Sequence, residues 1–422
     1  MGRPVWSLLR YTDRRSETGH RLAAADGLAR PAQARDSLSM NKIFVALASG
    51  VLLGACAHVA GRSPDATLKD AYRDAFRFGT AVNEAIVSGA DTASQRIVLR
   101  QFNTITNENV LKAERVNPRP GVYEWADGDA FVDFGERAGM FIVGHTLVWH
   151  NQTPAWFFQD STGKPNTPAA QAERLRSHIQ AVAGRYAGRI HAWDVVNEVV
   201  DNDGSYRPTT WVRGIGNGDS LVTLAFRYAS QYAPGAELYY NDFNAWRPAK
   251  RDGIVRLVRM LKQQGIRIDG VGMQGHWGLN YPRTEYIEAA IDSFAALGVK
   301  VMITELDVDV LPLTREGQII GQGMSDPQFQ LEEFKTYLDP YRTGLPADVQ
   351  QRLSGRYAEL FRIFHRKRDK IDRVTLWGVH DGMSWKNGYP IPGRTNYPLL
   401  FSRDRTPKPA FDAVLKVPAE MK

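Results

Sequence analysis

Short apolar runs alternate with longer amphipathic stretches through most of this 422-residue chain. The apolar runs lie at 76–82, 102–106, 141–146, 190–196, 238–240, 271–274, 299–304 and 374–377. Helical patterns separate several of them, at 171–187, 219–232, 251–264, 284–297 and 345–370. Strands that alternate with helices predict parallel βαβ units, and runs without strict apolar–polar alternation are typical of strands buried on both faces.

This alternation limits the fold to the α/β class. A closed (β/α)8 barrel commonly forms one domain of about 250 to 400 residues. Periodicity alone does not separate such a barrel from an open parallel sheet, so both remain possible at this point. Gly265 and Gly298 follow two helical stretches, where glycine typically ends a helix. We expect one α/β domain over residues 66–420.

The beginning of the chain has a different pattern. Residues 40–55 have the architecture of a signal peptide, with Lys42 before an apolar run at 43–53 that is too short for an ordinary spanning helix. The run closes with Leu53-Gly54-Ala55-Cys56, which resembles the lipobox of bacterial lipoproteins and implies lipidation of Cys56. The alternative is a buried apolar helix in which the cysteine is incidental.

Residues 1–39 precede this signal and are rich in arginine. Because signal peptides begin near the chain start, we expect 1–39 to result from a start assigned too far upstream; a genuine Arg-rich extension is the alternative. Residues 56–65 are expected to form a tether. The resemblance implies a lipid-anchored protein of the bacterial cell envelope, at the outer membrane or in the periplasm. The single cysteine excludes an internal disulfide.

Polar and aromatic residues follow seven of the apolar runs. Side chains that follow the strands of a parallel barrel meet at its C-terminal end. One strand ending in a carboxylate is weak evidence, because every strand must meet solvent, but several converging ends predict a functional site. The residues concerned are Glu108, Asn109, Lys112, His145, Trp149, Asn197, Glu198, Gln274, His276, Glu305, Asp307, Trp377 and Trp385.

Two carboxylates stand out because they follow apolar runs far apart in the chain, Glu198 and Glu305. Paired carboxylates, one protonated and one ionised, are the usual equipment for cleaving a glycosidic bond. Asn197 could donate to a sugar hydroxyl, and His276 could bond a carboxylate while Asp307 fixes its tautomer. The pattern therefore favours sugar chemistry.

Aromatic and charged residues beside these carboxylates suit a sugar cleft. Trp149, Trp377 and Trp385 could cover the flat faces of pyranose rings, although a single tryptophan is more often a core residue. Their polar neighbours favour the cleft. Lys112 and Glu108 could form a solvated salt bridge, but their place after a strand favours a set of partners for sugar hydroxyls.

These motifs resemble those of family 10 glycoside hydrolases, which are retaining β-1,4-xylanases. The resemblance covers nearly all of residues 66–415 and is carried by the segments 108–112, 144–150, 193–198, 274–276, 304–307, 377–385, 398–401 and 407–410. It implies a (β/α)8 barrel, with Glu198 as acid/base and Glu305 as nucleophile of a double displacement. The two carboxyl groups should then lie about 5–5.5 Å apart.

The resemblance also implies roles for the surrounding residues. Asn197 and His276 match residues that support the nucleophile and the bound sugar. The glycone-side sugar contacts would be Glu108, Asn109, Lys112, His145, Trp149, Gln274, Trp377 and Trp385. We expect xylan or xylo-oligosaccharides as substrate, no metal or organic cofactor, and a monomer whose only membrane contact is its lipid anchor. The segment 311–341 departs from the family in being long.

Two other functions remain possible at this point. A retaining β-1,4-glucanase would use the same barrel and carboxylates, because only the width of the cleft separates glucose from xylose. A glycan-binding surface lipoprotein would be expected to have lost a carboxylate, and both are present. The net charge is +7, of which residues 1–39 carry +3. The remaining +4, spread over a large domain without a basic stripe, argues against nucleic-acid binding.

Overall fold

The computed structural model describes residues 66–311, 336, 338–389 and 393–422. The expected upstream extension (1–39), signal peptide (40–55) and tether (56–65) with Cys56 lie outside the described residues, as does most of the segment 311–341. Within the described part of the chain, no helix is long and apolar enough to cross a membrane.

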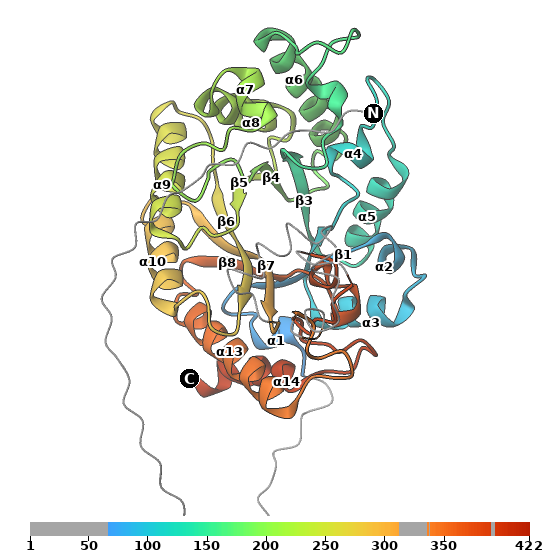
Figure 1. Ribbon diagram of the computed structural model, residues 1–422, viewed down its shortest axis with the longest axis vertical. Helices are drawn as coiled ribbons and strands as arrows, with labels where there is room; N and C mark the ends of the chain where they lie inside the picture. The colour runs from blue at the N-terminus through green and yellow to red at the C-terminus, as the bar shows by residue number, and fades with distance from the viewer. Residues whose placement is uncertain (1–65, 312–335, 337, 390–392) are drawn as a thin grey trace, which may run out of the picture. The chain divides into compact units, whose positions relative to one another are not determined.

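Eight parallel strands form a closed barrel in which each strand pairs with the next and β8 pairs with β1 (Figure 1). The strands are β1 (Arg77–Val82), β2 (Thr104–Asn107), β3 (Phe141–Val148), β4 (Ala192–Asn197), β5 (Glu237–Asp242), β6 (Gly270–Gly278), β7 (Lys300–Asp309) and β8 (Ile371–Leu376). The closing pair sets Arg77 opposite Arg373 and Thr80 opposite Leu376. The predicted (β/α)8 barrel is confirmed and the open sheet is excluded.

Helices surround the barrel (Figure 1). They are α1 (Leu68–Ala71), α2 (Glu84–Ser88), α3 (Thr92–Gln101), α4 (Ala113–Val116), α5 (Ala126–Arg137), α6 (Pro168–Arg185), α7 (Thr210–Ile215), α8 (Gly218–Tyr232), α9 (Pro248–Gln263), α10 (Thr284–Ala295), α13 (Ala347–Arg366) and α14 (Pro409–Glu420), with short 3-10 turns η1 (Ala155–Phe157), η3 (Asp381–Met383) and η4 (Trp385–Asn387). The five predicted helical stretches correspond to α6, α8, α9, α10 and α13. Gly265 and Gly298 both have a φ of 67°, the left-handed conformation in which glycine ends a helix.

The hydrophobic core lies between the outer surface of the strands and the apolar faces of the helices. Phe361 of α13 stacks on Phe78 of β1 with ring centroids 5.3 Å apart. Tyr72 packs against both rings and donates its hydroxyl to the carbonyl of Val414 in α14. Full burial of a large apolar side chain stabilises a fold by about 1.5–3 kcal/mol. This packing fixes β1 against α13.

Strands β6 and β7 continue beyond the predicted ends at 274 and 304, so these two boundaries were wrong. The pairing register shifts between Gln274 and His276 where β6 meets β7, and between Ile303 and Leu306 where β7 meets β8. Such irregularities re-aim a side chain without ending the strand. Glu305 lies within the second shift and has a φ of 55°, which is uncommon outside glycine.

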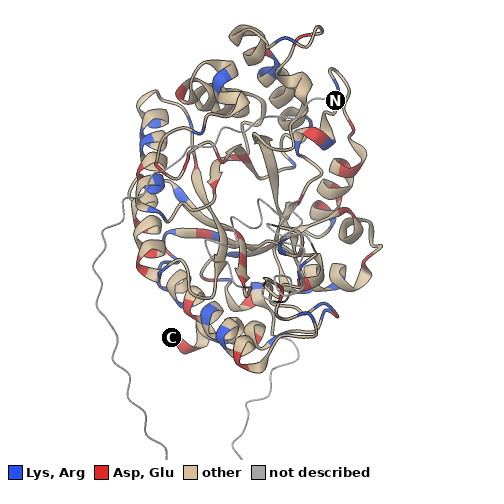
Figure 2. Cartoon of the chain, viewed as in Figure 1, with Lys and Arg blue, Asp and Glu red and all other residues tan. Residues whose placement is uncertain are grey.

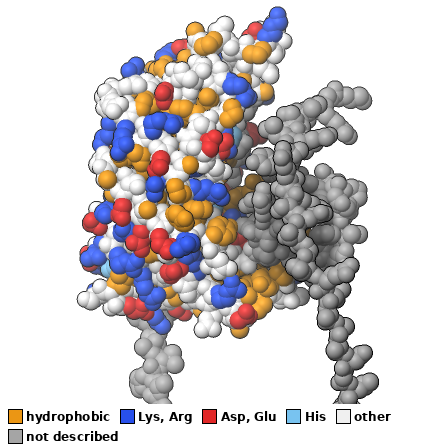
Figure 3. All heavy atoms as spheres, turned by 60° about the vertical axis from the view of Figure 1, so that its left-hand side comes forward, with side chains coloured by type: hydrophobic (Ala, Val, Ile, Leu, Met, Phe, Trp, Pro, Cys, Tyr) orange, Lys and Arg blue, Asp and Glu red, His pale blue; other side chains and the backbone are white. Residues whose placement is uncertain are grey.

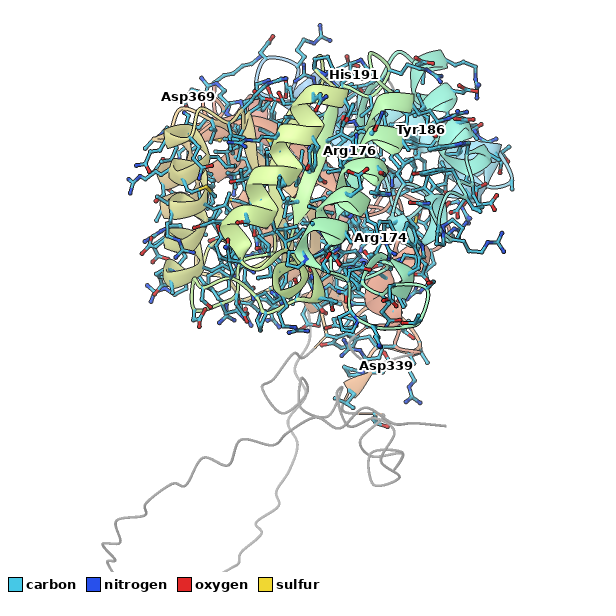
Figure 4. All side chains as sticks on the ribbon, turned by 90° about the horizontal axis from the view of Figure 1, so that it is seen from above. Arg174, Arg176, Tyr186, His191, Asp339 and Asp369 are labelled. Atoms are coloured by element: carbon cyan, nitrogen blue, oxygen red, sulfur yellow. The ribbon has the colours of Figure 1, made fainter. Side chains whose placement is uncertain are left out.

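The two ends of the barrel carry different residues. His191 and Asp369, which precede β4 and β8, lie at one end, and Asp339, which follows β7, lies at the opposite end (Figure 4). Basic and acidic residues are interspersed over the outer helices (Figure 2), and the face drawn in Figure 3 has the same mixture. Mixed signs avoid the large single-sign field that draws a protein to nucleic acid.

Candidate active site

Apart from Cys56, all of the site residues predicted from the sequence except Asp307 line a single cleft at the C-terminal end of the strands. Its volume is about 550 Å³. The lining includes Glu108, Asn109, Lys112, His145, Trp149, Asn197, Glu198, Gln274, His276, Glu305, Trp377 and Trp385. A larger hollow of about 1300 Å³ lies at the N-terminal ends of the strands, where its lining includes Arg77 and Asp269. Conserved chemistry in barrels of this type belongs to the C-terminal end, so the smaller cleft is the candidate site.

Glu305 is held by two neighbours and is only 5% exposed. Asn241 Nδ2 donates to its Oε1 at 2.7 Å, and His276 Nε2 lies 3.0 Å from its Oε2. The other ring nitrogen, His276 Nδ1, lies 2.9 Å from Asp307 Oδ2. Carboxylate oxygens only accept, so the ring donates from both nitrogens as an imidazolium. Burial opposes this charge, but Asp307 and Glu305 outweigh it and raise the pKa of His276 to about 9.

Asp307 does not line the cleft but lies behind it, fully buried. Burial alone would raise its pKa, but the charges of His276 and Lys386 and a hydrogen bond from Trp385 outweigh burial and lower it. Trp385 Nε1 donates to Asp307 Oδ2 at 2.8 Å. One buried carboxylate therefore fixes both the imidazolium beside Glu305 and an indole ring on the cleft wall.

Glu198 follows β4 directly and has a φ of 61°. Its carboxylate receives three side-chain hydrogen bonds: Trp149 Nε1 donates to Oε2 at 2.8 Å, Gln274 Nε2 to Oε1 at 3.0 Å and Asn197 Nδ2 to Oε1 at 3.4 Å. These donors come from the β3, β6 and β4 ends of the barrel. The orientation of this carboxyl group is therefore set by three separate strands.

A chain of amide side chains links the two carboxylates. Asn241 Nδ2 donates to Glu305 and also to Asn197 Oδ1 at 3.0 Å. Gln274 Nε2 donates to the same Asn197 oxygen at 3.2 Å and to Glu198 at 3.0 Å. Glu198 and Glu305 therefore face one compartment, and their relative position is fixed by hydrogen bonds rather than by the flexibility of two long side chains.

His145 packs against Trp377, which forms part of the wall of the cleft. It is buried, its Nδ1 lies 2.9 Å from Asp194 Oδ2, and its ring meets the edge of Trp377 at 5.3 Å. Asn107 holds the His145 backbone on both sides, accepting from its N–H at 2.9 Å and donating to its carbonyl at 2.6 Å. These bonds fix the position of His145, and thereby the position of the Trp377 ring that packs against it.

Lys112 is a buried donor rather than one half of a solvated salt bridge. Its Nζ donates to Asn109 Oδ1 at 3.1 Å and to Gln152 Oε1 at 2.9 Å, and it lies 4.8 Å from the centre of the Trp149 ring. Burial lowers the pKa of Lys112 against the attraction of nearby carboxylates, and burial raises the pKa of Glu108. These polar groups are suited to sugar hydroxyls at the β2 side of the cleft.

Comparison with known proteins agrees with this geometry. The model of glycosyl hydrolase family 10 matches residues 67–417. The Endo-1,4-beta-xylanase A of Xylanibacter ruminicola is 41% identical over 370 residues, which cover 87% of this chain and 97% of that protein. An Endo-1,4-beta-xylanase of Geobacillus stearothermophilus is 38% identical and covers 83% of this chain and 98% of that one.

The chain belongs to glycosyl hydrolase family 10. A GH10 endoxylanase retrieved from a sugarcane soil metagenome has a similar structure, with a TM-score of 0.77, 42% sequence identity, and coverage of 84% of this chain and 99% of that one. The barrel is therefore the fold of the family.

Sequence reasoning did not select several residues that line this family 10 cleft or hold its carboxylates. Asn241 belongs to a polar group visible after the fifth apolar run, but its two acceptors depend on strand register. Gln152 and Asn244 have positive φ values, 45° and 53°, that the sequence does not reveal. Phe243 and Tyr389 also line the cleft; Tyr389 is 60% exposed and stacks on Trp385 at 5.1 Å.

Glu198 and Glu305 are bonded to amides, one indole and an imidazolium. Among the described residues, no group of three or more His, Cys, Asp or Glu is placed to hold a metal ion. The arrangement offers two carboxylates held by hydrogen bonds and a cleft with aromatic walls, which together suit acid–base and nucleophilic chemistry on a sugar.

Proposed function

We propose that Glu305 is the nucleophile and Glu198 the acid/base of this family 10 enzyme, which is a retaining endo-1,4-β-xylanase. The observation that carries the assignment is that both carboxylates face one cleft and are linked by the amides of Asn241, Asn197 and Gln274. Retaining hydrolysis needs two carboxyl groups on opposite sides of a single bond. The names of the relatives support xylan as the substrate.

The first step forms a glycosyl-enzyme. Glu305 attacks the anomeric carbon while Glu198 gives its proton to the glycosidic oxygen, and the bond between that carbon and oxygen breaks. The departing part of the xylan leaves as an alcohol. Asn241 and the His276 imidazolium hold Glu305 in place for the attack. The two hydrogen bonds also limit the rotations that the carboxylate would lose in the transition state.

The second step releases the sugar. Glu198, now a carboxylate, takes a proton from water as the water oxygen attacks the anomeric carbon, and the bond to Glu305 breaks. Two inversions at one carbon give net retention. Trp149 and Gln274 keep the Glu198 carboxyl aimed at the same point in both steps, because both donate to it from fixed strand ends.

Sugar binding falls to the residues around the two carboxylates. Trp377 and Trp385 offer aromatic faces, and Lys112, Asn109 and Glu108 offer polar groups on the β2 side. We propose that these residues bind the glycone part of the chain. Phe243 and Asn244 follow β5, on the far side of Glu198 from β2, and are suited to the departing part.

Replacement of Glu305 tests its role as the nucleophile. Glu305→Ala should lower kcat on xylan by about 10⁴-fold or more, and added azide should restore part of the rate by replacing the missing nucleophile. Glu305→Gln, which keeps the shape of the side chain, is the matched control for packing and should be equally inactive. A wild-type rate in either variant would contradict the assignment.

A second activity deserves measurement because one relative, from Thermoclostridium stercorarium, is named "Thermostable celloxylanase" and is 36% identical over 364 residues. We propose xylan as the main substrate and a slower action on β-1,4-glucan. Initial rates on xylan and carboxymethyl cellulose should differ by about tenfold or more. Equal rates would support the glucanase alternative. Binding of xylan without product release would support a glycan-binding protein instead.

We further propose that the chain is a monomeric, lipid-anchored protein of the bacterial cell envelope. The support is the signal-like segment 40–55 and the motif that ends at Cys56. Mass spectrometry of the mature protein should find a lipidated Cys56 as the first residue, with 1–39 absent. Cys56→Ala should move the enzyme from the membrane fraction to the aqueous fraction. An unmodified Cys56 in the mature protein would contradict the proposal.

A further inference from the structure

A fully buried ion pair lies behind the cleft, between the first turn of α9 and the end of β5. Lys250 Nζ lies 2.7 Å from Asp242 Oδ1, and neither side chain has any exposed surface. Burying two charges costs several kcal/mol per ion, and a buried pair is often no more stabilising than apolar residues of the same size. Stability alone therefore does not explain the pair, and its contacts show what else it does.

Asp242 is connected to the backbone just beyond Glu198. The Tyr240 hydroxyl donates to Asp242 Oδ2 and accepts from the backbone N–H of Val200 at 3.1 Å. On the other side, the N–H of Glu198 donates to the Asn241 carbonyl at 2.9 Å. Tyr240 and Asn241, which are consecutive in β5, therefore hold the backbone at Val200 and Glu198.

This support matters because Glu198 has a left-handed backbone, with a φ of 61°. Such a conformation is unfavourable for a non-glycine residue and persists only where the surroundings enforce it. A small relaxation of the backbone would move the carboxyl group at the end of a flexible side chain. A misplacement of about 1 Å can cost a catalytic group about 100-fold in rate.

Lys250 is connected to the wall of the cleft. Its Nζ lies 3.8 Å from the centre of the Phe243 ring, and Phe243 lines the cleft beside Glu198. A desolvated cation over an aromatic ring is attracted to the negative face of that ring. The same ammonium group thus holds Asp242 on one side and Phe243 on the other.

We propose that Lys250 and Asp242 are positioning residues that hold the Glu198 carboxyl in line with the departing oxygen and hold Phe243 against the departing sugar. This inference rests on the proposed role of Glu198 as acid/base. Burial raises the pKa of Asp242 to about 6 and lowers the pKa of Lys250, and the charge of Glu198 acts on both groups. The pair is therefore electrostatically coupled to the carboxyl that it positions.

Two variants separate positioning from folding. Lys250→Met removes the ammonium group but leaves Asp242 unpaired, whereas Lys250→Met/Asp242→Leu removes both charges and avoids a lone buried carboxylate. Lys408→Met is the matched control, because Lys408 and Asp381 form another buried pair at 3.0 Å that does not line the cleft. All rates are divided by the concentration of active sites, which is measured as the amount of protein that can be labelled at Glu305.

The decisive readout is whether the loss of rate in a variant appears only with a substrate that needs a proton from Glu198. Cleavage of xylotetraose needs the acid, whereas labelling of Glu305 by 2,4-dinitrophenyl 2-deoxy-2-fluoro-β-xylobioside does not, because dinitrophenolate departs without a proton. Both Lys250 variants should lose about tenfold or more of kcat on xylotetraose and keep a labelling rate within about twofold of wild type. Lys408→Met should leave the ratio of the two rates unchanged.

The possible outcomes decide between the two proposals. If Glu198→Ala shows the same split and the Lys250 variants do not, the positioning inference is overturned while the role of Glu198 stands. If Glu198→Ala itself shows no split, the acid/base assignment is overturned. A double variant with no sites that can be labelled would show that the pair serves folding and would also overturn the inference.

Discussion

The positive charge on His276 should be measurable as a pH dependence of stability. The ring lies between two carboxylates, and although burial opposes its charge, Asp307 and Glu305 raise its pKa from 6.5 to about 9. This difference corresponds to about 3 kcal/mol of the free energy of unfolding. The perturbation that tests it is His276→Asn, which keeps a polar side chain but does not titrate.

The sign of the effect follows from the direction of the shift. A group with a higher pKa in the folded protein binds its proton more tightly there, so its stabilisation is complete below pH 6.5 and is lost as the pH rises through about 9. The other described histidines with shifted pKa values are shifted downward and act below this window. Buried lysines such as Lys112 and Lys250 act in the opposite sense, so only the difference from the variant isolates His276.

Urea unfolding followed by tryptophan fluorescence, at pH values from 6 to 10, is the assay. Relative to His276→Asn, the wild type should lose about 1 kcal/mol of unfolding free energy per pH unit between pH 7 and 9. Comparison of slopes does not require the two proteins to be equally stable at any one pH. If the unfolding free energies of the wild type and His276→Asn change with pH at the same rate in this window, His276 is not an imidazolium there. The positive charge assigned to it beside Glu305 would then be refuted.

Three further substitutions test the hydrogen bonds and ion pairs of the structure. Trp149→Phe keeps an aromatic ring but removes the N–H that donates to Glu198 at 2.8 Å, so kcat on xylan should fall about tenfold in steady-state assays, and an unchanged kcat would contradict the contact. Gln152→Ala removes an acceptor of Lys112 and should raise KM for xylo-oligosaccharides about fivefold with little change in kcat; a fall in kcat alone would contradict a binding role. Lys408→Met leaves a carboxylate buried without its cation and should lower the free energy of unfolding by about 3–5 kcal/mol in urea, whereas a loss below about 1 kcal/mol would contradict its importance.

The parallel α/β architecture and the convergence of the site could be predicted because polar residues follow seven of the eight apolar runs. Glu198 follows an apolar run directly, and a parallel arrangement sends every such end to one rim. The choice between barrel and open sheet could not come from the pattern, since it depends on whether β1 and β8 pair. The resemblance to family 10, rather than periodicity, indicated closure before the structure did.

Other features depend on three-dimensional detail that the pattern does not contain. Asn241 was visible as a polar residue, but its bond to Glu305 follows from the register of β5. The bulged path of β7 turns Glu305 into the cleft, and no local signal marks a bulge within an apolar run. The importance of Lys250 was hidden because a lysine in the first turn of a helix is normally exposed, and only packing against Asp242 shows it to be buried.

The central claim is that Glu305 attacks the anomeric carbon and that hydrolysis proceeds by two displacements. The most direct measurement is ¹H NMR of the first-formed product during rapid hydrolysis of xylohexaose, before the new reducing end mutarotates. Double displacement predicts that the β-anomer forms first and then relaxes toward the equilibrium mixture. Initial formation of the α-anomer would show a single displacement by water and would contradict the account.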